Sequence, residues 1–187
     1  MANQIILASN SPRRKELLSN LGFGFEVRVK EVDESFPKEL SPTQIAEFIA
    51  QTKANAYSVS DHETLITADT VVAHKGQILG KPENKAHAVD MLKQLSGNTH
   101  KVITGVCIKT NDKQVLFSET TVVHFKQLSE TEILHYVDHY KPYDKAGAYG
   151  IQEWIGMIGV ERIEGCFYNV MGLPTQKLYE VLVSSFR

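Results

Sequence analysis

Hydrophobic and polar positions follow two different periods along this chain, and each change of period marks the boundary of a predicted element. The apolar residues 5–8 predict a short buried strand, and the leucines within 11–21 lie on one face of an amphipathic helix. Further strands are predicted at 25–32, 64–73, 78–79, 102–109 and 115–125. Further helices are predicted to begin at Ser41, Asn84, Ser129 and Pro174. The glycine-rich residues 147–172 are expected to form short strands.

The connections between the predicted strands indicate the kind of sheet. Strands and helices interleave along the chain, which is typical of an α/β protein. However, the turns at 74–77 and 110–114 are too short for a crossover between parallel strands. We therefore expect a mixed sheet flanked by helices. No repeat or linker divides the chain, so residues 1–187 are expected to form a single domain.

Charge balance and cysteine content narrow the class of protein. The 187 residues include 20 Lys and Arg against 22 Asp and Glu, so the chain lacks the basic excess that is typical of a nucleic-acid-binding protein. No apolar stretch has the length of a membrane span, and the first residues lack the basic region of a signal peptide. Cys107 and Cys166 form neither a CxxC motif nor a disulfide framework. We expect a cytoplasmic protein that binds neither a membrane nor a nucleic acid polymer.

The helix predicted at 11–21 begins with an unusual charge pattern. Ser11 is a good N-cap and Pro12 suits the first helical position, but Arg13 and Arg14 follow at once. The start of a helix carries unpaired N–H groups and the positive end of the dipole, so it favours acidic residues. Two arginines at this position therefore suggest that an anion binds there.

Other charged residues lie near the ends of predicted elements or interrupt them. Asp69 interrupts a β-branched strand, where a carboxylate is costly to bury without a compensating cation, and Glu34 ends the strand before the second helix. Lys53 lies on that helix and Lys81 follows a hairpin. Such a set suits a phosphate substrate with a divalent cation, because lysines neutralise phosphate oxygens and carboxylates hold Mg²⁺. Taken singly, Glu34, Lys53 and Lys81 would be read as surface residues, and Asp69 could have a structural hydrogen-bonding role.

One alternative metal site deserves comparison with this set. His135 and His139 are four residues apart on a predicted helix, which is the spacing of a zinc-binding pair. A third ligand and the activating glutamate of an HExxH motif are absent from the sequence around them. Two partly exposed histidines on one helix face are the ordinary interpretation.

Six matching stretches in the same order make the chain resemble the Maf family of nucleoside triphosphate pyrophosphatases, within the branch that acts on dTTP and UTP. The six stretches that carry this resemblance are 8–14, 32–34, 53–54, 68–72, 80–82 and 144–152. The resemblance implies an elongated fold with a central mixed sheet and two lobes around a cleft, similar to the inosine triphosphate pyrophosphatases. It also implies a cytoplasmic homodimer that removes unwanted nucleotides from the pool, with a possible link to cell-division arrest.

The resemblance assigns roles to the residues of these stretches. Asp69 is the general base that takes a proton from the attacking water, and Glu34 and Asp69 hold a divalent cation (Mg²⁺, Mn²⁺ or Co²⁺). The substrate triphosphate is then the anion expected at the helix start. The residues implied to bind its phosphates are Ser9, Arg13, Arg14, Lys53 and Lys81.

Base preference is implied to depend on three positions, Arg13, Thr70 and Gln152. A Gln side chain offers both a donor and an acceptor, which matches the N3–H and carbonyl edge of thymine or uracil. The alternatives are a 7-methyl-GTP pyrophosphatase and a non-catalytic regulator of septum formation. The chain departs from the family pattern after Gln152, where residues 153–160 replace an expected glycine and a shorter segment.

Overall fold

The structure is a computed structural model that describes residues 4–185. Its strands are β1 (Gln4–Leu7), β2 (Phe25–Val27), β3 (Glu63–His74), β4 (Gln77–Leu79), β5 (Thr99–Lys109), β6 (Gln114–Phe125) and β7 (Val160–Glu164). Its α-helices are α1 (Pro12–Asn20), α2 (Pro42–Asn55), α3 (Lys85–Leu95), α4 (Glu130–Tyr140), α5 (Trp154–Gly159), α6 (Phe167–Met171) and α7 (Thr175–Ser185). A 3-10 turn, η1 (Ala146–Ala148), precedes α5.

The chain divides into two compact units, and β3, β5 and β6 each contribute residues to both. The first unit contains the residues up to Thr70, Thr104–Glu119 and the residues from Gly172 onward, and the second contains Val71–Ile103 and Thr120–Met171. Within residues 4–185 the strand order is β2-β1-β3-β5-β6-β7, with β4 paired to β3.

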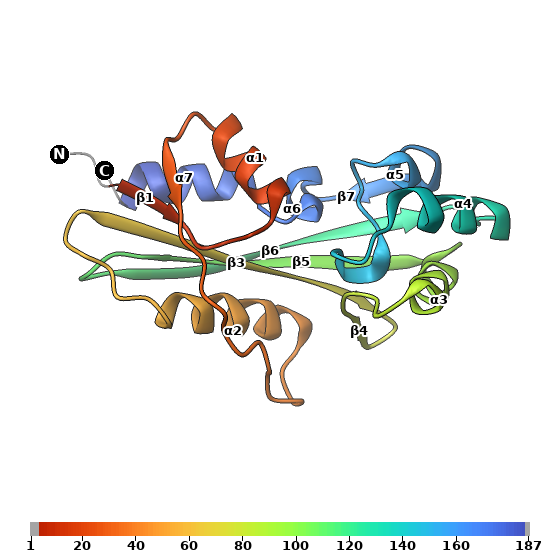
Figure 1. The fold of residues 1–187 in the computed structure, drawn as a ribbon, viewed down its shortest axis with the longest axis horizontal. Helices are drawn as coiled ribbons and strands as arrows, with labels where there is room; N and C mark the ends of the chain where they lie inside the picture. The colour runs from red at the N-terminus through yellow and green to blue at the C-terminus, as the bar shows by residue number, and fades with distance from the viewer. Residues whose placement is uncertain (1–3, 186–187) are drawn as a thin grey trace. The chain divides into compact units, whose positions relative to one another are not determined.

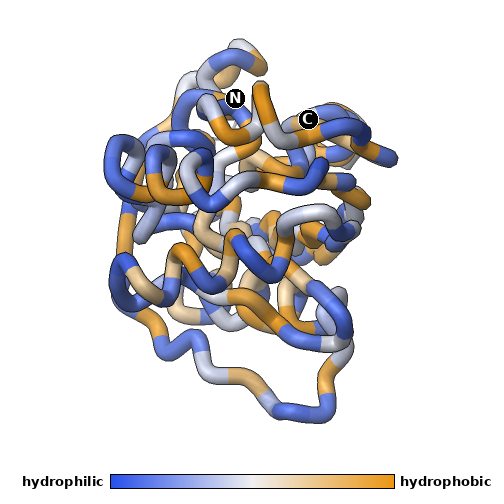
Figure 2. The backbone as a smooth tube through the Cα atoms, turned by 90° about the vertical axis from the view of Figure 1, so that its right-hand side faces the viewer, coloured by the Kyte–Doolittle hydropathy of each residue, from blue (hydrophilic) through white to orange (hydrophobic). Residues whose placement is uncertain are grey.

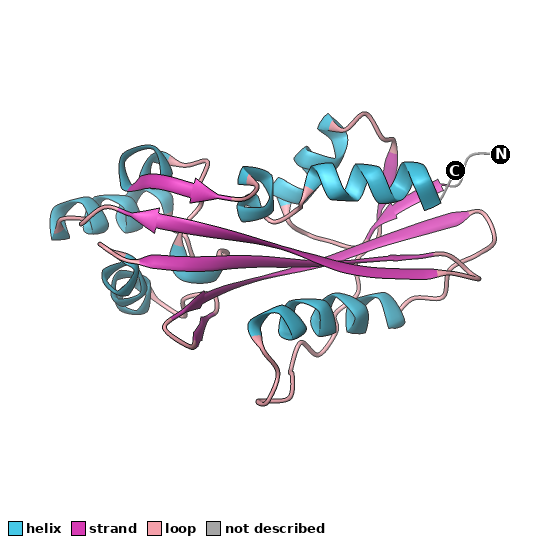
Figure 3. Cartoon of the chain, turned by 180° about the vertical axis from the view of Figure 1, so that it is seen from behind, coloured by secondary structure: helices cyan, strands magenta, loops and turns pink. Residues whose placement is uncertain are grey.

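In the first unit, helices cover both faces of the sheet. β1 pairs in parallel with β2 and with β3, so that Ile5 lies opposite Phe25 on one side and Thr64 on the other. Figures 1 and 3 show α1 and α7 on one face and α2 on the other. Hydrophobic and hydrophilic residues are interspersed at short intervals along the backbone (Figure 2), as expected for elements with one buried face.

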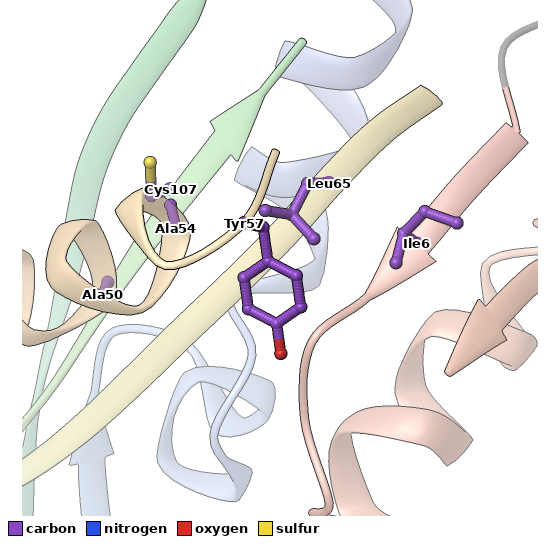
Figure 4. Packing of buried hydrophobic residues seen from close by; sticks show 6 residues of the cluster. All are labelled: Ile6, Ala50, Ala54, Tyr57, Leu65 and Cys107. Atoms are coloured by element: carbon purple, nitrogen blue, oxygen red, sulfur yellow. The ribbon is translucent and has the colours of Figure 1, made fainter. Parts of the chain in front are cut away.

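The core of the first unit joins the sheet to α2. Its central cluster consists of buried residues from β1, α2, β3, β5 and the turn after α2, shown in Figure 4: Ile6, Ala50, Ala54, Tyr57, Leu65 and Cys107. Burial also raises the pKa of the Cys107 thiol to about 11, so this cysteine is a core residue and not a reactive thiolate. The small Ala50 and Ala54 face the sheet, so α2, which carries Lys53, packs closely against it.

Side-chain caps begin the helices of both units where the sequence predicts them. Ser41 and Ser129 form complete capping boxes with Gln44 and Glu132, and Asn84 accepts a hydrogen bond from the N–H of His87. In the second unit, β3 pairs antiparallel with β4 through a short turn, and β6 pairs antiparallel with β7 although α4, η1 and α5 lie between them in the chain. Every helix within the described residues is too short or too polar to cross a membrane.

The expected α/β fold with a central mixed sheet flanked by helices is confirmed, whereas two local predictions are wrong. The strand predicted at 25–32 ends at Val27, and residues 28–32 have no regular secondary structure, although the Arg28 N–H still donates to the Leu7 carbonyl at 3.1 Å. The region 147–172 contains one strand, β7, and otherwise the helical elements η1, α5 and α6. Helices as short as α5, with six residues, and α6, with five, depend on their tertiary contacts and are too short to show a helical period in the sequence.

Candidate active site

A lysine bridges two carboxylates in the first unit. The Lys53 ammonium, in the last turn of α2, lies 2.8 Å from Asp69 Oδ1 on β3 and 2.9 Å from Glu34 Oε1. The side chain of Asp69 is 13% exposed and that of Lys53 is 16% exposed, whereas Glu34 is 52% exposed. The carboxylate inside β3 is therefore compensated by a cation, as its cost of burial requires. Arg14 also interacts electrostatically with Asp69 and Glu34, so this group combines two cations with two carboxylates.

The two carboxylates are compatible with a divalent cation. Glu34 and Asp69 present hard oxygen donors, and Mg²⁺ commonly binds to one or two carboxylates while its other ligands are waters and substrate phosphates. Across residues 4–185 no three His, Cys, Asp or Glu side chains gather so as to hold a metal by themselves. The stacked rings of His135 and His139, with centroids 4.2 Å apart, belong to α4 in the second unit.

At the start of α1, two serine hydroxyls accept hydrogen bonds from backbone N–H groups. Ser11 is the N-cap, and its hydroxyl accepts a hydrogen bond from the Arg14 N–H at 3.4 Å. The buried Ser9 hydroxyl accepts one from the Ser11 N–H at 3.2 Å. Arg13 is half-buried on the same turn, and its charge contributes to lowering the pKa of Arg14. The first turn therefore combines two cations with the positive end of the helix dipole.

Arg14 is the most extensively bonded side chain of this turn. Its Nε donates to the Gly172 carbonyl at 2.8 Å, one terminal nitrogen donates to the Ala68 carbonyl at 2.9 Å, and the other donates to the Thr70 hydroxyl at 3.0 Å. A longer contact of 3.5 Å reaches the Ser9 hydroxyl. Burial lowers the pKa of Arg14, and the nearby charge of Asp69 opposes this shift. Arg14 thus connects α1, the residues on either side of Asp69 and the segment before α7.

Two partners in this network could not be identified from the sequence. The Thr104 hydroxyl on β5 lies 2.9 Å from the Thr70 hydroxyl, and the Gly172 carbonyl accepts from Arg14 across 158 residues. Gly172 has a φ of +116°, a backbone conformation that residues with a side chain rarely adopt, so glycine is the residue that fits this position without strain. An isolated threonine and one glycine among several give no local signal for such contacts.

The second unit holds the other two predicted site residues. Lys81 is exposed and follows Gly80, whose carbonyl accepts a hydrogen bond from the Gly147 N–H at 3.0 Å. Gln152 is half-buried, and its Oε1 is a buried acceptor with no hydrogen-bond partner among the described residues. The turn that carries Lys81 and the segment that ends at Gln152 are therefore neighbours.

The structure brings most of the predicted residues together in one unit. The first unit contains Ser9, Arg13, Arg14, Glu34, Lys53, Asp69 and Thr70, and the second contains Lys81 and Gln152. Chemically, the first set combines helix N–H groups, guanidinium groups and an ammonium with two carboxylates. Such a set can bind a polyanion, hold a cation and accept a proton.

Comparison with known proteins gives consistent matches over nearly the whole chain. The family model described as Maf-like protein matches residues 4–185. A dTTP/UTP pyrophosphatase of Bacteroides thetaiotaomicron is 57% identical over 179 residues, which cover 94% of this chain and 93% of that protein. A dTTP/UTP pyrophosphatase of Flavobacterium johnsoniae is 50% identical over 183 residues, covering 97% and 94%.

Among solved structures, a nucleoside-triphosphatase (dITP/XTP pyrophosphatase) from Mycobacterium abscessus matches with a TM-score of 0.42 and 16% sequence identity. The match covers 67% of this chain and 75% of that one. A likeness of this size is too low to support an inference about activity.

Proposed function

The chain belongs to the Maf-like protein family, and from this premise we propose that it is a nucleotide pyrophosphatase that hydrolyses dTTP and UTP. The proposal rests on one observation above the others, namely the pairing of Lys53 with both Glu34 and Asp69 beside the cationic first turn of α1. The names of relatives that match more than nine-tenths of the chain support the choice of substrate.

In the proposed reaction, water attacks the α-phosphorus of the bound nucleotide. Asp69 accepts the proton of the attacking water, a bond forms between the water oxygen and the α-phosphorus, and the bond to the bridging oxygen breaks. Pyrophosphate leaves with the electron pair, and the nucleoside monophosphate remains. A divalent cation held by Glu34 and Asp69 would neutralise phosphate charge and lower the pKa of water. A carboxylate is then a sufficient base.

Phosphate binding is proposed for several cationic and hydroxyl groups. Ser9, the N–H groups of the first turn and Arg13 would surround the triphosphate, with Arg14 contributing the N–H that its protein partners do not use. Lys53 and Lys81 would neutralise the charge that develops on the leaving pyrophosphate. Arg14 already donates to three acceptors at 3.0 Å or less, so most of its bonding capacity serves the protein.

Base selection is proposed for Arg13, Thr70 and Gln152. The Gln152 Oε1 has no partner in the described residues, which supports a role as acceptor for the N3–H of thymine or uracil. Its amide nitrogen would donate to a carbonyl of the same base. We also propose that residues 1–187 act as one domain, in the cytoplasm and as a homodimer, as the resemblance implies.

Pyrophosphate release from a panel of nucleoside triphosphates tests the proposed activity. The panel should contain dTTP, UTP, CTP, GTP and 7-methyl-GTP, with Mg²⁺ present. We expect the highest kcat/KM for dTTP and UTP. Preference for 7-methyl-GTP would move the protein to the other branch of the family, and binding without hydrolysis of any nucleotide would favour a regulatory role.

A further inference from the structure

Glu153 follows Gln152 directly, and its side chain joins a network of buried and partly buried side chains in the second unit. Glu153 Oε1 lies 3.1 Å from the Lys145 ammonium, and Oε2 accepts a hydrogen bond from the Tyr136 hydroxyl. The Glu153 side chain is only 20% exposed, and Lys145 is buried. A carboxylate in such a position is stable only because both of its oxygens have partners.

The same network holds the backbone of the segment that leads to Gln152. The Tyr136 hydroxyl accepts a hydrogen bond from the Gly150 N–H at 3.0 Å, and the Glu153 N–H donates to the Gly150 carbonyl at 3.0 Å. Burial raises the pKa of the Tyr136 hydroxyl, and the hydrogen bond to Glu153 raises it further. The hydroxyl therefore stays protonated and serves as donor to Glu153 and acceptor from Gly150.

The backbone of this segment needs external support. Ala148 has a φ of +59°, a left-handed conformation that is uncommon for a residue with a Cβ. A Cβ on Gly150 would lie 2.9 Å from the Glu153 carboxyl carbon and 3.1 Å from Lys145 Cε, so the network packs directly on the Gly150 backbone. Strained segments persist only where surrounding contacts fix them. Glu153, Lys145 and Tyr136 provide such contacts on both sides of Gln152.

We propose that Glu153 is a positioning residue that fixes the orientation of Gln152 and thereby sets the preference between nucleotide bases. This inference rests on the proposed role of Gln152 in base recognition. Glu153 acts through the segment, because its two oxygens are occupied by Lys145 and Tyr136 and its own N–H closes the turn on Gly150. In a chain with glycine at this position, the same backbone would have no such anchor.

The test compares Glu153→Gln with a matched control in the same unit, Glu132→Gln. Like Glu153, Glu132 is paired with a lysine, in this case Lys126 at 2.8 Å. Its second oxygen accepts a hydrogen bond from the Ser129 N–H, so its contacts hold the first turn of α4 and not the segment 147–152. Amide hydrogen exchange without nucleotide should be faster over residues 147–152 in Glu153→Gln and unchanged there in Glu132→Gln. This measurement does not depend on activity. Equal protection of 147–152 in wild type and Glu153→Gln would overturn the proposed anchoring.

The second readout is the ratio of kcat/KM for UTP to that for CTP. We expect Glu153→Gln to lower this ratio about tenfold, within the range that one pocket contact can supply. A merely structural loss would reduce turnover of all bases equally and leave the ratio unchanged, as we expect for Glu132→Gln. In a Gln152→Ala background, Glu153→Gln should no longer change the ratio. A full effect in that background would show that Glu153 acts independently of Gln152.

Two results separate failure of this inference from failure of the proposed function. Wild-type protein that shows no preference between UTP and CTP would contradict the role of Gln152, whatever the exchange data show. A wild-type preference that Gln152→Ala abolishes and Glu153→Gln leaves intact would overturn the positioning role alone. Should Glu153→Gln fail to fold, Tyr136→Phe removes the bridging hydroxyl from the same network and is expected to give the same changes.

Discussion

Replacing Arg14 by lysine tests whether this residue holds the candidate site together. Lysine keeps the positive charge, but a single ammonium cannot reproduce the planar arrangement of N–H groups that contacts three acceptors. Those acceptors are the Gly172 carbonyl, the Ala68 carbonyl and the Thr70 hydroxyl, at 2.8, 2.9 and 3.0 Å. Arg14→Lys can satisfy one of them, so two of these hydrogen bonds are lost, although the Thr70 hydroxyl keeps its contact with the Thr104 hydroxyl at 2.9 Å.

The size of the effect follows from these contacts. A hydrogen bond from a charged donor contributes about 1.5–3 kcal/mol to stability. Because the Arg14 side chain is half-buried and partly screened by water, we expect the loss of two such bonds to lower the free energy of unfolding by about 2–4 kcal/mol. For a protein of this length, such a loss corresponds to a decrease in Tm of roughly 5–10 °C. Because Ala68 precedes Asp69 and Thr70 follows it, the same variant should also lower kcat for every nucleotide.

Urea unfolding in the absence of nucleotide measures this prediction directly, since no ligand then contributes to stability. Arg162→Lys is the matched control, because Arg162 is 67% exposed and forms a surface ion pair with Glu164 at 2.8 Å. The control is expected to change the unfolding free energy by less than about 0.5 kcal/mol. An Arg14→Lys variant as stable as this control would refute the structural role of Arg14.

Three further predictions concern the base, the cation and the effect of acid. Asp69→Asn should reduce turnover of dTTP at least ~10²-fold, the typical loss for a positioned general base. The variant should also be less stable, since Lys53 then keeps only Glu34 as a charged partner. Near wild-type turnover in a folded variant would place the base elsewhere. Excess chelator should abolish turnover and added Mg²⁺ or Mn²⁺ should restore it, so full activity in chelator would contradict the proposed cation site. Burial is the main cause that lowers the pKa of His100 to about 3 in the folded protein. In the unfolded chain the pKa of a histidine is ~6.5. Between these two pH values the His100 imidazole therefore binds a proton only in the unfolded state. His100 should therefore cost up to about 1.4 kcal/mol of stability per pH unit below ~6.5, and unfolding curves at several pH values should show a shallower dependence in His100→Asn, whereas equal slopes would count against the assignment.

Much of the fold could be predicted because its signals are local. The serine caps at positions 11, 41 and 129 act within three residues, and β3 and β6 are long β-branched runs. The helices of the glycine-rich residues 147–172 could not be predicted from the sequence. For example, α5 has six residues, two of them glycine, and no side-chain cap. Such a helix forms only because its surroundings hold it, and a short window of sequence does not contain them.

The candidate site could be predicted in its residue types but not in its bonding. An aspartate within an apolar strand and two arginines at a helix start are visible in the sequence, because both oppose local preference. Their partners are distant along the chain, as with Lys53 and Asp69 or Arg14 and Gly172. The contacts of Glu153 could not be predicted either, because Tyr136 lies 17 residues away and no local pattern pairs the two residues.

The most direct test of the proposed activity is the position of the oxygen taken from water. Hydrolysis of dTTP in ¹⁸O-labelled water, followed by mass analysis of both products, identifies which phosphorus is attacked. Attack at the α-phosphorus places the label in the nucleoside monophosphate and leaves the pyrophosphate unlabelled. Label in pyrophosphate or in free orthophosphate would contradict the proposed reaction.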